Sequence, residues 1–109
     1  MSYKVEVTAD FERDIKSLLK KYRSLKQEFA ELIDSLENNP EQGTPLGRDC
    51  YKIRLAIKSK GRGKSGGARV ITYVRVVNET VFLLAIYDKS EQDSISDETV
   101  RDRLDDLNE

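Results

Sequence analysis

Two stripes of apolar residues at helical spacing restrict what this chain can fold into. Within each stripe the apolar residues recur every three or four positions, which is typical of a helix with one buried face. Pro40 ends the second stripe, because proline cannot donate to a continuing helix. Two helices joined so tightly are expected to form an antiparallel hairpin that buries its stripe on a sheet. The stripes contain Phe11, Ile15, Leu18, Leu19 and Tyr22, and then Leu25, Phe29, Leu32, Ile33 and Leu36.

Much of the remaining chain alternates apolar and polar residues, which indicates strands. Residues 39–50 are rich in turn formers and are expected to be a connection. A short last helix is predicted after Ser96. The sequence therefore predicts one α+β domain over residues 1–109, with the N-terminal strand and helical hairpin packed on one face of a mainly antiparallel four-stranded sheet. The predicted strands are residues 3–8, 51–58, 68–77 and 80–88.

The residue types present exclude several kinds of site. The 109 residues include no histidine and one cysteine, Cys50, which excludes a Ser-His-Asp triad, a Cys/His zinc site and an internal disulfide. We expect no metal and no cofactor, so any catalysis must use lysine, arginine, tyrosine or carboxylates. No apolar run approaches the roughly 20 residues of a membrane span. With no signal-peptide pattern and an unpaired cysteine, we expect a cytoplasmic protein that does not bind membranes.

A net charge of −1 conceals a strong asymmetry along the chain. Residues 48–69 carry eight cations against Asp49 alone, whereas residues 88–109 carry three cations and nine acids. A basic block beside an acidic tail indicates a surface that binds a polyanion, together with a segment that restrains it. The simpler alternative is a solvated hairpin and a solvated helix.

The strand pattern gathers the cations on one face. Side chains alternate across a strand, so the helical hairpin would cover the apolar face and leave the cations on an open one. Cations among aromatic rings suit single-stranded nucleic acid, although each tyrosine alone is equally an ordinary strand residue. The glycine-rich loop that follows adds Lys60, Arg62 and Lys64 as phosphate contacts. The expected open face holds Lys52, Arg54, Lys58, Arg69, Tyr73, Tyr87 and Lys89.

The segments YKIRLAIKSKGRGKSGGARVITY and LLAIYDKSE resemble the RelE/ParE superfamily of bacterial toxins. The similarity is closest to the HigB-like branch, which has a comparable series of K-I-R, lysine- and glycine-rich loop, G-G-x-R and I-Y-x-K-x-E. It covers essentially the whole chain, with its specific part in residues 51–91. The resemblance implies a ribosome-dependent mRNA endonuclease that needs no metal. Its implied partners are a cognate antitoxin, the ribosome and mRNA.

The resemblance also implies roles for individual residues. Lys52, Arg54, Arg69 and Lys89 match the family's basic site residues, and we add Tyr87 as a fifth catalytic candidate. The RNA-binding candidates are Lys58, Lys60, Arg62, Lys64 and Tyr73.

One position departs from the family pattern. Ile95 stands where RelE-type toxins have a tyrosine that acts as general base, so that role falls to Tyr87, Lys58 or Glu91. In the implied reaction a ribose 2′-hydroxyl attacks the adjacent phosphate, and Arg54 and Arg69 stabilise the dianionic transition state.

Two other functions remain open from the sequence. One is a ParE-like DNA gyrase inhibitor without nuclease activity, and the other is a non-catalytic RNA-binding module. The acidic last helix is interpreted as a solvated cap, or alternatively as a shield for the basic face.

Overall fold

The computed structural model describes residues 2–60 and 66–107, which form a mixed five-stranded sheet with strand order β1-β5-β4-β3-β2. β1 is parallel to β5, and the other neighbouring strands are antiparallel. None of the helices in these described residues has the length and apolar character that crossing a membrane requires. In chain order the elements are β1 (Lys4–Val7), α1 (Ala9–Lys21), α2 (Leu25–Asn38), β2 (Thr44–Gly47), β3 (Cys50–Leu55), the 3₁₀ turn η1 (Lys58–Lys60), β4 (Ala68–Arg75), β5 (Thr80–Asp88) and α3 (Asp97–Leu107).

The sheet has five strands, so the prediction of four strands was wrong. β2 lies within residues 39–50, which were expected to be a connection, and it pairs with β3. The two strands are joined by Arg48 and Asp49, both of which have positive φ, at 56° and 62°. This is the geometry of a type I′ hairpin turn, which usually contains an Asn-Gly or similar pair. Because this turn lacks glycine, the sequence gave no indication of a hairpin here.

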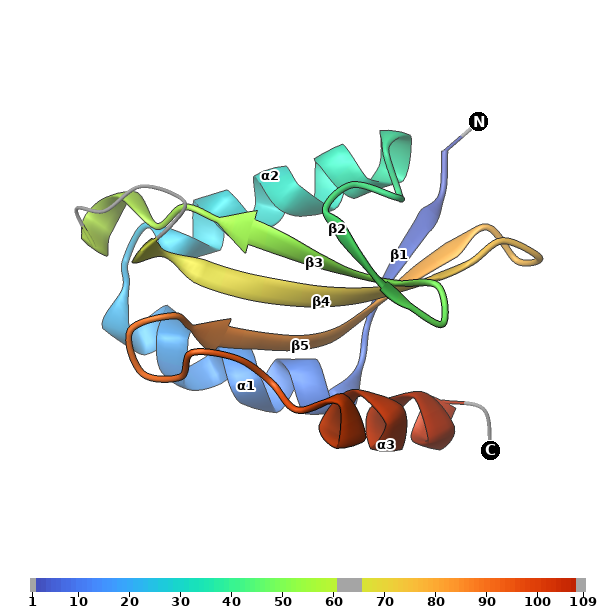
Figure 1. Ribbon diagram of the computed structural model, residues 1–109. Coiled ribbons are helices and arrows are strands. Elements are labelled where there is room, and N and C mark those ends of the chain that lie inside the picture. The colour runs from blue at the N-terminus through green and yellow to red at the C-terminus, as the bar shows by residue number, and fades with distance from the viewer. Residues whose placement is uncertain (1, 61–65, 108–109) are drawn as a thin grey trace.

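The helical hairpin forms as predicted and covers one face of the sheet. In Figure 1, α1 and α2 lie behind the strands. Thr8 begins α1, and its Oγ1 accepts a hydrogen bond of 3.2 Å from the backbone N–H of Phe11. The rings of Phe11 and Phe29 stack at 5.4 Å between centroids, which joins the two helices over the core. Leu19 is an exception to the predicted core, because it is 38% exposed.

The opposite face of the sheet is not open as predicted. α3 lies below β5 in Figure 1 and packs Val100 and Leu104 against a second apolar cluster, which includes Ile71, Phe82 and Leu84. The acidic last helix is therefore more than a solvated cap, because its apolar side is buried. β5 is consequently covered on both faces and is buried along its whole length.

The end of β5 contains a buried carboxylate, Asp88, that joins three parts of the chain. It accepts a hydrogen bond of 2.5 Å from the Tyr22 hydroxyl, an ion pair from Lys60 and two hydrogen bonds from Ser90. Burial alone would raise the pKa of Asp88, but the hydrogen bonds from Lys60, Tyr22 and Ser90 hold it well below its usual range. The network ties η1 to the end of α1 and to β5.

We predict that Asp88→Asn lowers the free energy of unfolding by about 3–5 kcal/mol at neutral pH, because the Lys60 ammonium would stay buried without its counter-charge. The depressed pKa of Asp88 means that its stabilisation is complete above the unfolded value near 4 and is lost as pH falls below it. Urea denaturation at pH 7 and pH 3 measures both effects. Asp102→Asn, on the exposed side of α3, is the matched control. Equal losses for the two variants at pH 7 would contradict the prediction.

Candidate functional site

Three of the predicted site residues form a row across the sheet. Arg54 of β3 pairs with Arg69 of β4, which pairs with Tyr87 of β5, so their side chains share one face. Lys52 lies two residues before Arg54 and faces the same way, in register with Ile71. Lys52, Arg54, Arg69 and Tyr87 therefore lie on the face of the sheet opposite the helical hairpin, as the sequence predicted.

The row is less accessible than the sequence predicted. Arg54 is exposed, but Arg69 and Tyr87 are each only 6% exposed. Tyr87 is buried in the second apolar cluster, against which Ile95 packs. Burial raises the pKa of Tyr87, although the nearby charges of Arg69 and Lys89 act in the opposite direction. The Tyr87 phenol is therefore protonated at neutral pH and is available as a hydrogen-bond donor.

Lys89 follows directly after β5, and its ammonium is held by Asp93. Its Nζ lies 2.5 Å from Asp93 Oδ1 and 2.8 Å from the Asp93 carbonyl oxygen. The hydrogen bond from Lys89 and the charges of Lys89, Arg69 and Lys52 lower the pKa of Asp93. Asp93 is thus an ionised carboxylate among the site cations. Sequence reasoning did not single it out, although its spacing of four residues from Lys89 was a usable signal.

The RNA-binding candidates are not all gathered at this row. Lys58 belongs to η1, because β3 ends at Leu55 rather than at residue 58 as predicted, and its backbone N–H donates to Glu28 Oε2 at 2.7 Å. The side chain of Lys60 is only 9% exposed in its ion pair with Asp88, so its contact with phosphate stays a prediction. Arg62 and Lys64 lie outside the described residues.

Tyr73 shares the face of the row but not its location. It pairs with Phe82 and Cys50, four residues along β4 from Arg69, which is about 13 Å at strand spacing. Its ring stacks on Phe82 at 6.0 Å between centroids, and the Arg75 guanidinium lies 5.8 Å from the ring centroid. Tyr73 is therefore part of an aromatic group at the other end of the sheet.

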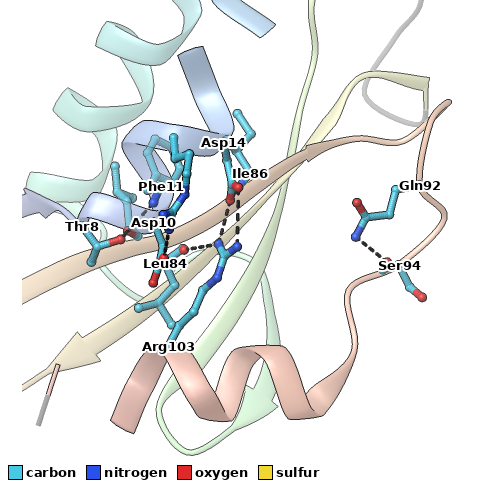
Figure 2. Close-up of polar contacts among 11 residues, drawn as sticks. Thr8, Asp10, Phe11, Asp14, Leu84, Ile86, Gln92, Ser94 and Arg103 are labelled. Carbon is cyan, nitrogen blue, oxygen red and sulfur yellow. Dashed lines mark hydrogen bonds and ion pairs between the residues drawn. The ribbon is translucent and has the colours of Figure 1, made fainter. Parts of the chain in front are cut away.

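An ion pair from α3 fixes the part of β5 that precedes Tyr87. β1 ends at Val7, opposite Leu83, so the next residues of β5 lack a strand partner on that side. Arg103 Nη1 donates to the Leu84 carbonyl at 2.8 Å and to Asp14 Oδ2 at 2.7 Å, as Figure 2 shows. Asp14 Oδ2 also accepts a 3.3 Å hydrogen bond from the backbone N–H of Ile86. Asp14 and Arg103 thus supply hydrogen-bond partners for the Ile86 N–H and the Leu84 carbonyl on the edge of β5 that β1 leaves unpaired.

The same contacts support an irregularity that determines the register of the row. Ile71 pairs with Ala85 and Thr72 pairs with Leu83, so Leu84 is an extra residue in β5. Beyond this bulge the pairing resumes and places Tyr87 opposite Arg69. A bulged backbone held by Arg103 and Asp14 thus positions the phenol.

Replacing Arg103 by alanine is predicted to lower the free energy of unfolding by about 1–3 kcal/mol, since the Leu84 carbonyl would lose its partner. Arg101→Ala is the matched control, because Arg101 pairs with Asp97 at 3.5 Å where both side chains are more than half exposed. It is expected to change stability by less than about 1 kcal/mol. Chemical denaturation compares the two variants, and equal effects would show that the edge contact contributes nothing beyond a surface ion pair.

The arrangement can bind and polarise an anion. Lys52, Arg54, Arg69 and Lys89 supply positive charge, and Tyr87 supplies a neutral donor. Within residues 2–60 and 66–107 there is no group of three histidine, cysteine, aspartate or glutamate side chains that could hold a metal ion. The four cations and the phenol can stabilise a developing negative charge by electrostatic interaction.

Known proteins share this fold. The family model described as "RelE toxin of RelE / RelB toxin-antitoxin system" matches residues 4–104. A mutant of the Escherichia coli toxin RelE in the free state is similar, with a TM-score of 0.63 and 18% identity over 98% of this chain and 99% of that chain. The RelBE2 toxin–antitoxin complex from Mycobacterium tuberculosis gives a TM-score of 0.61 and 22% identity over 81% of this chain and 99% of that chain. The predicted RelE-like fold is confirmed.

Proposed function

The chain belongs to the RelE family of toxins of toxin–antitoxin systems, and on that premise we propose that it is an endonuclease that cleaves mRNA on the ribosome. The observation that carries the proposal is the Arg54–Arg69–Tyr87 row, with Lys52 and Lys89 beside it. A row of cations with a buried phenol matches what phosphate cleavage needs, which is stabilisation of negative charge and movement of a proton.

In the proposed reaction the 2′-oxygen of one ribose attacks the phosphorus of the adjacent phosphate. The O2′–P bond forms and the P–O5′ bond breaks, while the proton of the 2′-hydroxyl passes to a water molecule and another proton reaches the departing O5′. Arg54 and Arg69 stabilise the dianionic phosphorane, because both guanidinium groups lie on the same face of the sheet and each presents several N–H donors to phosphate oxygens. No step requires a metal ion.

Tyr87 is the residue best placed for a proton-transfer role. Of the other candidates, Glu91 lies 3.8 Å from Lys21, and Lys58 is on η1 beyond the end of β3. Tyr87 pairs directly with Arg69, and its raised pKa keeps the phenol protonated. We therefore assign to Tyr87 the donation of a hydrogen bond, and then of the proton, to the departing oxygen, in place of the general-base role considered from the sequence.

If this role is correct, Tyr87→Phe lowers the rate of the chemical step by about 10²–10³ with little change in RNA affinity, since removal of one preorganised donor has that effect elsewhere. Tyr73→Phe, which removes the same hydroxyl from the same face at the other end of the sheet, is the control and is expected to leave the rate unchanged. Single-turnover cleavage on programmed ribosomes gives the rate, and its dependence on toxin concentration gives the affinity. Equal rates for both variants would remove Tyr87 from the mechanism.

The proposed function is tested by adding the protein to a reconstituted bacterial translation system and mapping mRNA ends by primer extension. We expect cleavage within the translated frame, none on naked mRNA, and a loss of about 100-fold with Arg54→Ala. Arg54 is exposed, so its replacement leaves the core intact, and the exposed Arg101→Ala is the matched control. Intact mRNA in the presence of folded protein would overturn the nuclease proposal.

An inhibitory antitoxin is part of the proposal. The similar protein from Mycobacterium tuberculosis was crystallised as a toxin–antitoxin complex. An unrestrained nuclease of this kind would stop the growth of its host, so we propose that the chain is produced with a cognate antitoxin that blocks its site.

The alternative function is inhibition of DNA gyrase without nuclease activity. The observation in its favour is Ile95, which places an apolar side chain where the resemblance implies a general base. A DNA supercoiling assay with gyrase distinguishes the two functions. A gyrase inhibitor would reduce supercoiling, whereas an mRNA nuclease is expected to leave it unchanged.

A further inference from the structure

A carboxylate, Asp93, stands beside the proposed cleavage site in the segment that joins β5 to α3. The backbone N–H groups of Glu91 and Gln92 both donate to the Asp88 carbonyl at 3.0 Å, which forms a turn directly after β5. The Gln92 side-chain amide donates to the Ser94 carbonyl at 2.9 Å, as Figure 2 shows. These contacts hold Asp93 at a defined place between the turn and α3.

The Asp93 carboxylate interacts with four of the five proposed site residues. Lys89 Nζ donates to Asp93 Oδ1 at 2.5 Å, and this hydrogen bond does most to lower the pKa of Asp93. The charges of Arg69 and Lys52 lower that pKa further. Burial does most to raise the pKa of Tyr87, and the Asp93 carboxylate raises it further. Asp93 is therefore an electrostatic part of the site.

The ion pair between Lys89 and Asp93 is placed to open when a phosphate binds. The two side chains are 30% and 93% exposed, and an ion pair in contact with water contributes little to stability. A phosphate of the RNA therefore competes with Asp93 for the Lys89 ammonium at little cost. When Lys89 donates to the phosphate instead, the main cause of the lowered pKa is removed and the Asp93 carboxylate becomes a stronger base.

The other groups near the site that were considered for proton transfer are engaged elsewhere. Glu91 lies 3.8 Å from Lys21. Asp88 is buried on the opposite face of the sheet in its hydrogen bond with Tyr22. Tyr87 is protonated and is assigned to the departing oxygen. An ionised carboxylate next to the bound phosphate is what the attacking hydroxyl requires as a proton acceptor.

We propose that Asp93 is the general base that accepts the proton of the attacking 2′-hydroxyl, in place of the water molecule. The inference rests on the proposed function. The O2′–H bond breaks and its proton passes to an Asp93 carboxylate oxygen, while the O2′–P bond forms and the P–O5′ bond breaks. Tyr87 gives its proton to O5′. Exchange of protons with solvent then restores the Asp93 carboxylate and the Tyr87 phenol. The chain thereby has a base although Ile95, two residues later, cannot act as one.

The first test replaces Asp93 by asparagine, which keeps the size of the side chain and removes its basicity. We expect the single-turnover cleavage rate on programmed ribosomes to fall by about 10²–10⁴, the usual contribution of a general base. RNA affinity is not expected to fall, because the variant removes a negative charge from a site that binds phosphate. Asp102→Asn, on the exposed side of α3, is the matched control and is expected to cleave at the original rate.

The pH dependence of the cleavage rate separates a base from a residue that only holds Lys89. The original protein is expected to show a constant rate from about pH 6 to pH 8, because the carboxylate is ionised throughout. In Asp93→Asn hydroxide must take the proton, so the rate is expected to rise about ten-fold per pH unit. Asp93→Glu retains a carboxylate and is expected to keep the constant rate.

The remaining charged and titratable groups that face Asp93 are common to the original protein and Asp93→Asn, so a difference between their pH profiles belongs to Asp93. These groups are Lys52 of β3, Arg69 of β4, Tyr87 of β5 and Lys89 of the same segment. Equal rates for the original protein and Asp93→Asn, or a lower rate with a parallel pH profile, would overturn the general-base role and leave the nuclease proposal standing. Absence of cleavage by the original protein would overturn both.

Discussion

Burial of β5 on both faces and both edges is the constraint on which the rest of the structure depends. The strand pairs with β1 on one side and β4 on the other, and every residue from Thr80 to Asp88 is buried. One face receives the α1–α2 hairpin and the other receives α3. Since β1 pairs only as far as Leu83, the backbone of the next residues of β5 has Asp14 and Arg103 as partners in place of a strand, as Figure 2 shows. Those contacts hold the bulge that sets the register of the site.

The last two residues of β5 show how one strand serves stability and function together. Tyr87 and Asp88 are adjacent, so their side chains point to opposite faces. Asp88 enters a buried network with Tyr22 and Lys60, which fixes the start of the glycine-rich loop. Tyr87 enters the row with Arg69 and Arg54. The two arginines lie directly opposite one another on neighbouring strands and supply the positive charge that the proposed phosphate contact needs.

Patterning in the sequence was sufficient for the helices, for most strands and for the row of site residues. Helical spacing predicted α1 and α2, and alternation placed Lys52, Arg54, Arg69 and Tyr87 on one face. The likeness to RelE-type toxins, carried by residues 51–91, predicted the family that the chain belongs to. These features depend on local order in the sequence, and for that reason they were predictable.

The errors concern features that depend on distant parts of the chain. The β2–β3 hairpin is an exception, because its turn is local. It was missed because Arg48 is unusual at positive φ and because Arg48-Asp49 does not match the Asn-Gly or Asp-Gly pattern of such turns. Lys60 was expected to contact phosphate from the glycine-rich loop, and its ion pair with Asp88 was not foreseen because the two residues are distant in the sequence. The expected open face is partly covered because the apolar side of α3, with Val100 and Leu104, packs on apolar residues of that same face, which include Ile71 of β4 and Leu84 of β5.

The central claim is that this cationic row cleaves RNA by attack of a 2′-oxygen, and the chemical nature of the product ends tests it most directly. Fragments of mRNA recovered from the translation reaction would be analysed for their terminal groups by mass spectrometry. The mechanism predicts a 2′,3′-cyclic phosphate on the upstream fragment and a 5′-hydroxyl on the downstream one, because the ribose itself supplies the nucleophile. A 3′-hydroxyl and a 5′-phosphate would contradict it, since those ends require water to attack the phosphorus.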